Sequence, residues 1–124
     1  MNVLIVDDEL LLLRSLRRTL VRAGHHVTLA TNGRDALEAL AHADFDVVLS
    51  DVRMPEMDGV ELARRLARLH PTLPILFMSG HADTADRELL ELAPLAVLPK
   101  PLDELRLLRL LASLGGTQEA VATH

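Results

Sequence analysis

The sequence contains no cysteine, tryptophan or tyrosine, and its only aromatic residues are Phe45 and Phe77. The absence of cysteine excludes disulfide bonds and thiolate metal sites. With so few aromatic rings, aliphatic side chains must fill the core. No apolar run approaches the roughly 20 residues that a membrane-spanning helix needs, and the run at residues 3–6 is too short for the core of a signal peptide. We therefore expect a cytoplasmic protein that has no membrane partner.

Basic residues are also fewer than acidic ones. The chain has 13 Lys and Arg and 18 Asp and Glu, so its formal net charge is −5. This balance argues against nucleic acid as a partner. Of the 124 residues, 49% are hydrophobic. The chain is therefore long and apolar enough to form about one domain with its own core.

Short apolar runs alternate five times with helical patterns. The runs typical of strands occupy residues 3–6, 26–30, 47–51, 74–79 and 95–98, and the helical patterns occupy residues 10–23, 34–43, 58–69, 83–92 and 103–114. This alternation predicts an α/β fold, with a parallel sheet between two layers of helices. Gly115 and Gly116 predict the end of the last helix. We therefore expect one domain over residues 1–114 and a flexible tail over residues 115–124.

The apolar patterns of the runs also predict their order in the sheet. The runs at 3–6, 47–51 and 74–79 are continuous, as in the middle of a parallel sheet. The run at 26–30 alternates, and Pro99 follows the run at 95–98, so these two strands belong at the edges. The flavodoxin-like doubly wound order 2-1-3-4-5 satisfies both conditions.

Polar residues follow four of the five expected strands. They are Asp7 and Asp8 after the first strand, Asp51 at the end of the third, Ser79 at the end of the fourth and Lys100 after the fifth. Ligands of such sheets bind outside the carboxyl ends of the strands, which meet at one edge. We expect these five side chains to form one site.

Carboxylates that lie close together raise one another's pKa, and a divalent cation removes that conflict. A set of oxygen ligands without His or Cys favours Mg²⁺, and Mn²⁺ is the alternative. An aspartate can also act as a nucleophile and form an aspartyl phosphate. A cation and a lysine would then neutralise the transferred phosphoryl group, and a hydroxyl could donate a hydrogen bond to it. The alternative is purely structural. Asp7 or Asp8 would cap a helix, Asp51 would cap the following turn, Ser79 would be a satisfied strand end and Lys100 would lie at the surface.

Four segments resemble the receiver domain of two-component response regulators. They are Val6-Asp7-Asp8-Glu9, Asp51-Val52-Arg53-Met54-Pro55 with Met57-Asp58-Gly59, Met78-Ser79-Gly80-His81, and Lys100-Pro101. Their order and spacing extend the resemblance over residues 2–114, which is nearly the whole chain.

The resemblance implies a role for each residue of the site. Asp51 would be the phosphoacceptor, Lys100 would contact the phosphate and Ser79 would be the hydroxyl that responds to it. Asp8, Asp51 and the backbone carbonyl of Arg53 would bind Mg²⁺, with Asp7 assisting. The bond between Lys100 and Pro101 would be cis, which an X-Pro bond allows at low cost.

The resemblance also implies a function and partners. Asp51 would take a phosphoryl group from the phosphohistidine of a histidine kinase or a histidine phosphotransfer protein, and the change would switch binding of an unidentified downstream protein. We expect a switch that gains and loses its own phosphate rather than a turnover enzyme, with no output domain in this chain. A phosphatase that works through an aspartyl phosphate is the alternative.

The sequence departs from the family pattern near the fifth strand. Val97 stands where an aromatic residue is usual, Ala93-Pro94-Leu95 replaces the usual Gly-Ala, and Pro99 is unusual. These positions lie in or near the face formed by residues 83–92, 95–98 and 103–114. The leucines of residues 103–114 form a wider stripe than one core contact needs. We therefore also consider a homodimer that forms through this face.

Overall fold

The protein is described by a computed structural model, which covers residues 1–80, 89 and 91–122. Its five strands form one parallel sheet in the order β2-β1-β3-β4-β5. The strands are β1 (Asn2–Val6), β2 (His26–Ala30), β3 (Val47–Asp51), β4 (Ile75–Ser79) and β5 (Ala96–Pro99). Every residue of β3 is buried, whereas β2 alternates between exposed and less exposed residues. The predicted fold class, strand order and edge strands are confirmed.

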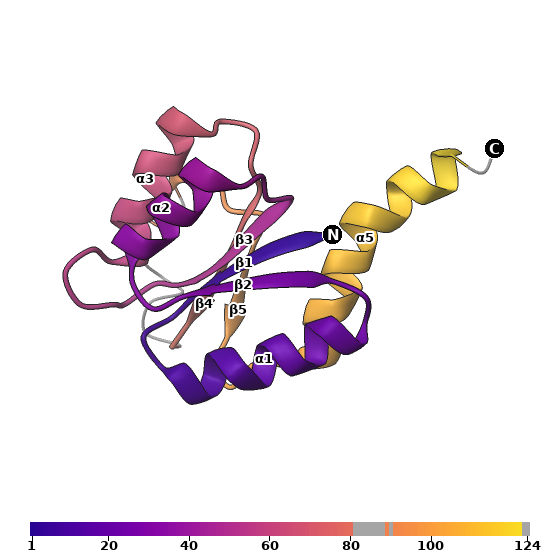
Figure 1. The fold of residues 1–124 in the computed structure, drawn as a ribbon, viewed down its shortest axis with the longest axis horizontal. Coiled ribbons are helices and arrows are strands. Elements are labelled where there is room, and N and C mark those ends of the chain that lie inside the picture. The colour runs from indigo at the N-terminus through magenta and orange to yellow at the C-terminus, as the bar shows by residue number, and fades with distance from the viewer. Residues whose placement is uncertain (81–88, 90, 123–124) are drawn as a thin grey trace.

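Helices cover both faces of the sheet (Figure 1). α1 (Leu10–Arg22) and α5 (Glu104–Ala122) lie on one face, and α2 (Gly33–His42) and α3 (Gly59–Leu69) lie on the other. Leu89 and Glu91 are helical, but most of the helix predicted at residues 83–92, including its proposed cap Asp83, lies outside the described residues. In the part of the chain that the structure covers, no helix is long and apolar enough to cross a membrane.

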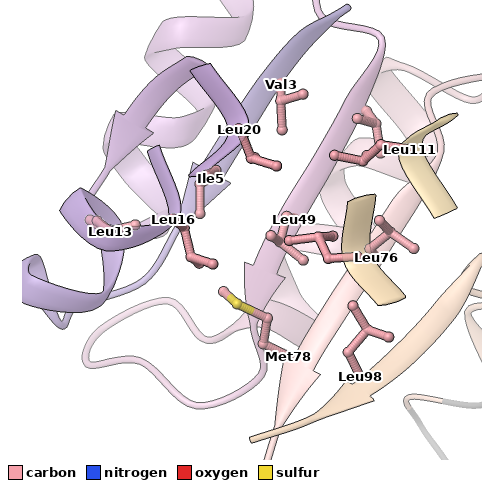
Figure 2. Close-up of a cluster of buried hydrophobic side chains, with 12 residues drawn as sticks. Val3, Ile5, Leu13, Leu16, Leu20, Leu49, Leu76, Met78, Leu98 and Leu111 are labelled. Atoms are coloured by element: carbon pink, nitrogen blue, oxygen red, sulfur yellow. The ribbon is translucent and has the colours of Figure 1, made fainter. Parts of the chain in front are cut away.

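The core between the sheet and α1 and α5 is aliphatic (Figure 2). Leu13, Leu16 and Leu20 of α1 meet Leu107 and Leu111 of α5 over the side chains of the central strands. On the opposite face, Phe77 is fully buried. Aliphatic side chains therefore supply most of the buried surface, as the shortage of aromatic residues predicts.

The predicted end of the last helix is wrong. α5 continues through Gly115 and Gly116 to Ala122, although glycine in a helix costs up to about 1 kcal/mol relative to alanine. Glycine lacks a strong helical preference but fits helical geometry. Upstream, Leu107, Leu111 and Leu114 already fix the helix against the core. The flexibility of residues 115–124 stays a prediction.

The wide leucine stripe of α5 is largely explained by this core. Leu107 and Leu111 are buried in it, and Leu108, Leu110 and Leu114 pack against it. Leu105 is 56% exposed. The stripe therefore gives little support to a dimer surface, and the homodimer stays a prediction.

Candidate functional site

The carboxyl ends of the strands bring the five predicted site residues to one edge of the sheet. Asp51 closes β3 and Ser79 closes β4. Asp7 and Asp8 directly follow β1, and Lys100 directly follows β5. The backbone N–H of Lys100 donates to the Ser79 carbonyl at 2.9 Å, so the two last strands are still paired where the site begins.

The three aspartates form an acidic group at this edge. One carboxylate oxygen from each of Asp7, Asp8 and Asp51 lies within 4.8 Å of the others. Asp7 is completely buried and Asp51 is 7% exposed, whereas Asp8 is exposed. Two of the acids are thus held inside the protein, and the third opens the group to solvent.

Lys100 bridges the two buried acids. Its Nζ lies 3.1 Å from Oδ2 of Asp7 and 3.2 Å from Oδ2 of Asp51. The lysine side chain is 24% exposed. A single ammonium therefore faces two buried carboxylates and compensates only part of their charge.

Burial and neighbouring charges both act on the pKa of Asp51. Burial raises it above its ordinary value, and the charge of Asp7 raises it further. Lys100 and a hydrogen bond from the backbone of Arg53 act in the opposite direction without cancelling the shift. Burial alone would lower the pKa of Lys100, but its hydrogen bond to Asp7 and the charges of Asp7 and Asp51 outweigh burial and raise it.

Asp7 is anchored on both oxygens. Its Oδ1 accepts a hydrogen bond from the backbone N–H of Glu9 at 2.9 Å, while Oδ2 meets Lys100. Glu9 is the N-cap residue of α1, and no side-chain hydrogen bond caps this helix. The structural alternative of Asp7 or Asp8 as an N-cap of α1 is therefore wrong.

The acidic group fits a hard divalent cation. Its donors are carboxylate oxygens only, which suit Mg²⁺ or Mn²⁺. Burial and the charge of Asp7 raise the pKa of Asp51, and a cation bound beside it would favour its ionised form. The exposed Asp8 would let a cation reach the group while it keeps some of its water.

Ser79 and Arg53 lie beside this group. Ser79 is fully buried, and its hydroxyl donates to the Gly80 carbonyl at 3.1 Å. The backbone of Arg53 hydrogen-bonds Asp51. The metal-binding role of the Arg53 carbonyl stays a prediction. The predicted cis bond between Lys100 and Pro101 is confirmed.

Gly59 also shapes the site through a close contact that the sequence pattern does not predict. A Cβ atom at this position would overlap the Asp51 carbonyl oxygen and lie 3.0 Å from Cα of Val52. The first residue of α3 therefore lies directly against the backbone of the phosphoacceptor candidate. The Asp58-Gly59 pair signals a helix start in the sequence, but the close approach depends on the tertiary fold.

The parallel sheet and its acid–lysine site define a doubly wound α/β protein with a charged site at the carboxyl ends of its strands. The comparisons with known proteins identify the family. Residues 3–112 match the response regulator receiver domain family. The chain belongs to this family.

Individual relatives agree with this assignment. The response regulator receiver protein CpdR of Brucella abortus is 43% identical over 84 residues, covering 68% of this chain and 70% of CpdR. The DNA-binding transcriptional regulator NtrC of Escherichia coli is 41% identical over 102 residues, which cover 82% of this chain but 22% of NtrC. The chain thus spans about a fifth of the length of that relative.

Solved structures show the same fold. The chemotaxis response regulator CheY4 of Vibrio cholerae superposes with a TM-score of 0.82 at 32% identity, covering 91% of this chain and 97% of CheY4. Full-length FixJ from B. japonicum gives a TM-score of 0.84 at 35% identity, covering 98% of this chain and 61% of FixJ.

Proposed function

We propose that the protein is a phosphorylation-controlled switch of a two-component system or phosphorelay, with Asp51 as the phosphoacceptor. The donor would be the phosphohistidine of a histidine kinase or of a histidine phosphotransfer protein. A carboxylate oxygen of Asp51 forms a bond to phosphorus as the bond between phosphorus and the imidazole nitrogen breaks. The imidazole leaves with the electron pair of the broken bond.

The observation that carries the proposal is the bridge from Lys100 to two buried acids. Lys100 Nζ is 3.1 Å from Asp7 and 3.2 Å from Asp51. A phosphoryl group on Asp51 would therefore arrive beside an ammonium that is already in place. Electrostatic groups that need no rearrangement are the ones that stabilise a transferring phosphoryl group best.

The residues around Asp51 have matching roles. Asp8, Asp51 and the Arg53 carbonyl would hold Mg²⁺ or Mn²⁺, and Asp7 would support them. Such a cation supplies positive charge for the phosphoryl oxygens. Ser79 would exchange its bond with the Gly80 carbonyl for one with a phosphoryl oxygen. This exchange of partners links the chemical state of Asp51 to the end of β4.

The protein would act as a switch in the cytoplasm rather than as a turnover enzyme. Gain and loss of the phosphoryl group would change its binding of a downstream protein. The match to the receiver family gives no support to the alternative of an aspartyl-phosphate phosphatase.

Intact-mass measurement after incubation with Mg²⁺ and acetyl phosphate tests the proposal. We expect the addition of one phosphoryl group, which disappears in Asp51→Asn and when Mg²⁺ is chelated. Asp46→Asn is the matched control, because Asp46 is an acid at the opposite end of β3 and bonds the Asn2 backbone. Normal phosphorylation of Asp51→Asn would refute the assignment.

A further inference from the structure

The loop between β3 and α3 leaves the site at Asp51 and is closed at its base. The N–H of Val52 donates to the Met78 carbonyl at 3.1 Å, and the Val52 carbonyl accepts the N–H of Gly59 at 2.8 Å. Residues 53–58 therefore form a loop beside the phosphoacceptor, and hydrogen bonds at its base close it. Arg53, the first residue of that loop, hydrogen-bonds the Asp51 side chain through its backbone.

Met57 attaches this loop to the first turn of α2. A Cβ atom at Gly33 would lie 2.7 Å from Sδ and 2.9 Å from Cγ of Met57. Gly33 is buried and Met57 is half-buried, so the methionine side chain occupies the space that any other residue at position 33 would fill. The turn is held firmly, because Oδ1 of Asn32 accepts the N–H of Asp35 at 2.8 Å.

The conformation of the loop indicates that it needs such an attachment. Glu56, next to Met57, has φ of 68°, a left-handed conformation that costs a non-glycine residue about 1 kcal/mol or more. Met54 provides the other apolar contact of the loop that the structure describes, and it is buried among residues of α2 and α3. Two methionines thus hold a strained loop against the rest of the fold.

We propose that Met57 and Gly33 are positioning residues for the phosphorylation site. Their contact holds the loop so that the Arg53 peptide stays against the Asp51 carboxylate. The consequence for phosphorylation rests on the proposed function, but the contact itself can be tested without phosphate or metal. α2, which contributes no residue to the acidic group, thereby controls the geometry of that group.

A double-mutant cycle tests the proposal with Gly33→Ala, Met57→Ala and the double variant. Gly33→Ala expels Met57 into the neighbouring hollow of about 200 Å³ that Gly33, Met57 and Glu61 help to line. The first readout is hydrogen exchange of the Arg53 amide in metal-free protein, and the second is the Kd for Mg²⁺ from amide chemical shifts. Both single variants should exchange faster and bind Mg²⁺ about tenfold more weakly, the low end of the effect of residues that orient metal ligands.

In the double variant, the Arg53 amide should exchange no faster and Mg²⁺ should bind no more weakly than in the single variant with the larger effect. Both changes break the same contact, so their effects should not add. Leu111→Val is the control, since it removes core volume on the other face of the sheet and should leave both readouts unchanged. Unchanged Arg53 exchange in the single variants, or effects that multiply in the double variant, would overturn the positioning role. If the exchange responds as expected while the wild type takes up no phosphate, the proposed function fails and the positioning role stands.

Discussion

The acidic edge around Asp51 and the apolar cluster around Phe77 are neighbours, because Val52 of the cluster directly follows Asp51 at the end of β3. They differ in how completely their buried groups are compensated. At the edge, Lys100 faces two buried carboxylates and the pKa of Asp51 is raised. In the cluster, Val52, Phe77 and Leu89 are buried among apolar neighbours, and Val97 packs against them.

The difference separates the acidic edge, which would bind a cation and a phosphoryl group, from the apolar cluster, which stabilises the fold. The cluster gains stability from burial and has no conflict that a ligand could relieve. The edge keeps carboxylates close together, and their repulsion lowers the stability of the fold. A bound cation or a phosphoryl group would change that repulsion. Substitutions at the edge should therefore alter both stability and phosphorylation, and those in the cluster should alter mainly stability or response.

The largest effect is expected from Gly59→Ala. The new Cβ would overlap the Asp51 carbonyl and crowd Val52, so α3 and β3 must separate. We expect a loss of about 3 kcal/mol in the free energy of unfolding, the upper range for overpacking, together with slower phosphorylation. Urea denaturation and intact mass measure the two effects.

Gly115→Ala is the matched control for Gly59→Ala. It lies in α5, and its Cβ would meet only the flexible end of Met1 at 3.3 Å. We expect a gain of about 0.5–1 kcal/mol, because alanine is the better helix former. A stable, normally phosphorylated Gly59→Ala would contradict the close approach of α3 to Asp51.

The next effect is expected from Lys100→Met, which leaves Asp7 and Asp51 without their shared cation. Removing one partner of a buried ion pair costs about 3–5 kcal/mol, and the 24% exposure of Lys100 places its loss lower, at about 2 kcal/mol. Because the pKa of Lys100 is raised, its contribution is present at neutral pH and is lost as pH rises above 10.5 through the raised pKa.

Arg65→Met is the control for Lys100→Met. It removes an ion pair with Glu61 at 3.2 Å, but both side chains are more than 40% exposed, so the loss should be below about 1 kcal/mol. Equal losses in the two variants by urea denaturation would show that Lys100 behaves as an ordinary surface lysine.

A smaller effect of opposite sign is expected from Asp51→Asn. The raised pKa means that the folded state binds the proton of Asp51 more tightly than the unfolded state does. In the wild type, stability from this group therefore falls as pH rises from 3.8 through the raised pKa. The variant should be more stable at neutral pH, by on the order of 1 kcal/mol, and the gain should vanish below pH 3.8. Denaturation curves of both proteins across this range measure the difference.

The sequence predicts the strands, their order and the polar residues of the edge, because parallel strands bring residues that directly follow them to one place. Asp51, Lys100 and Ser79 could be found by this rule alone. It cannot find Gly59 or the contact of Gly33 with Met57, since these depend on how α2 and α3 approach the loop. Local glycine preference predicts the wrong end for α5, because the helix continues past Gly115 and Gly116 from a segment that Leu111 and Leu114 hold against the core.

The smallest effect is expected at Val97. The resemblance to receiver domains implies an aromatic ring at this position, which would move when the hydroxyl of Ser79 approaches the phosphate. Val97 pairs with Phe77 in the sheet and packs into the apolar cluster. Its neighbour Leu98 lies in the opposite core with Leu107 and Leu111 of α5. A stiff β-branched side chain repacks little surface, so phosphorylation should disturb α5 only slightly.

Amide chemical shifts with and without Mg²⁺ and beryllofluoride, a phosphate mimic, measure this response. A ligand shifts an equilibrium only through different interactions with its two states, so we expect large changes at Ser79 and Gly80 and small ones at residues 105–114. Val97→Phe is the comparison variant, and it should enlarge the changes along α5 because a ring restores surface that can repack. Changes along α5 of the wild type as large as those at Ser79 would contradict this prediction, because they would show that α5 responds without an aromatic residue on β5.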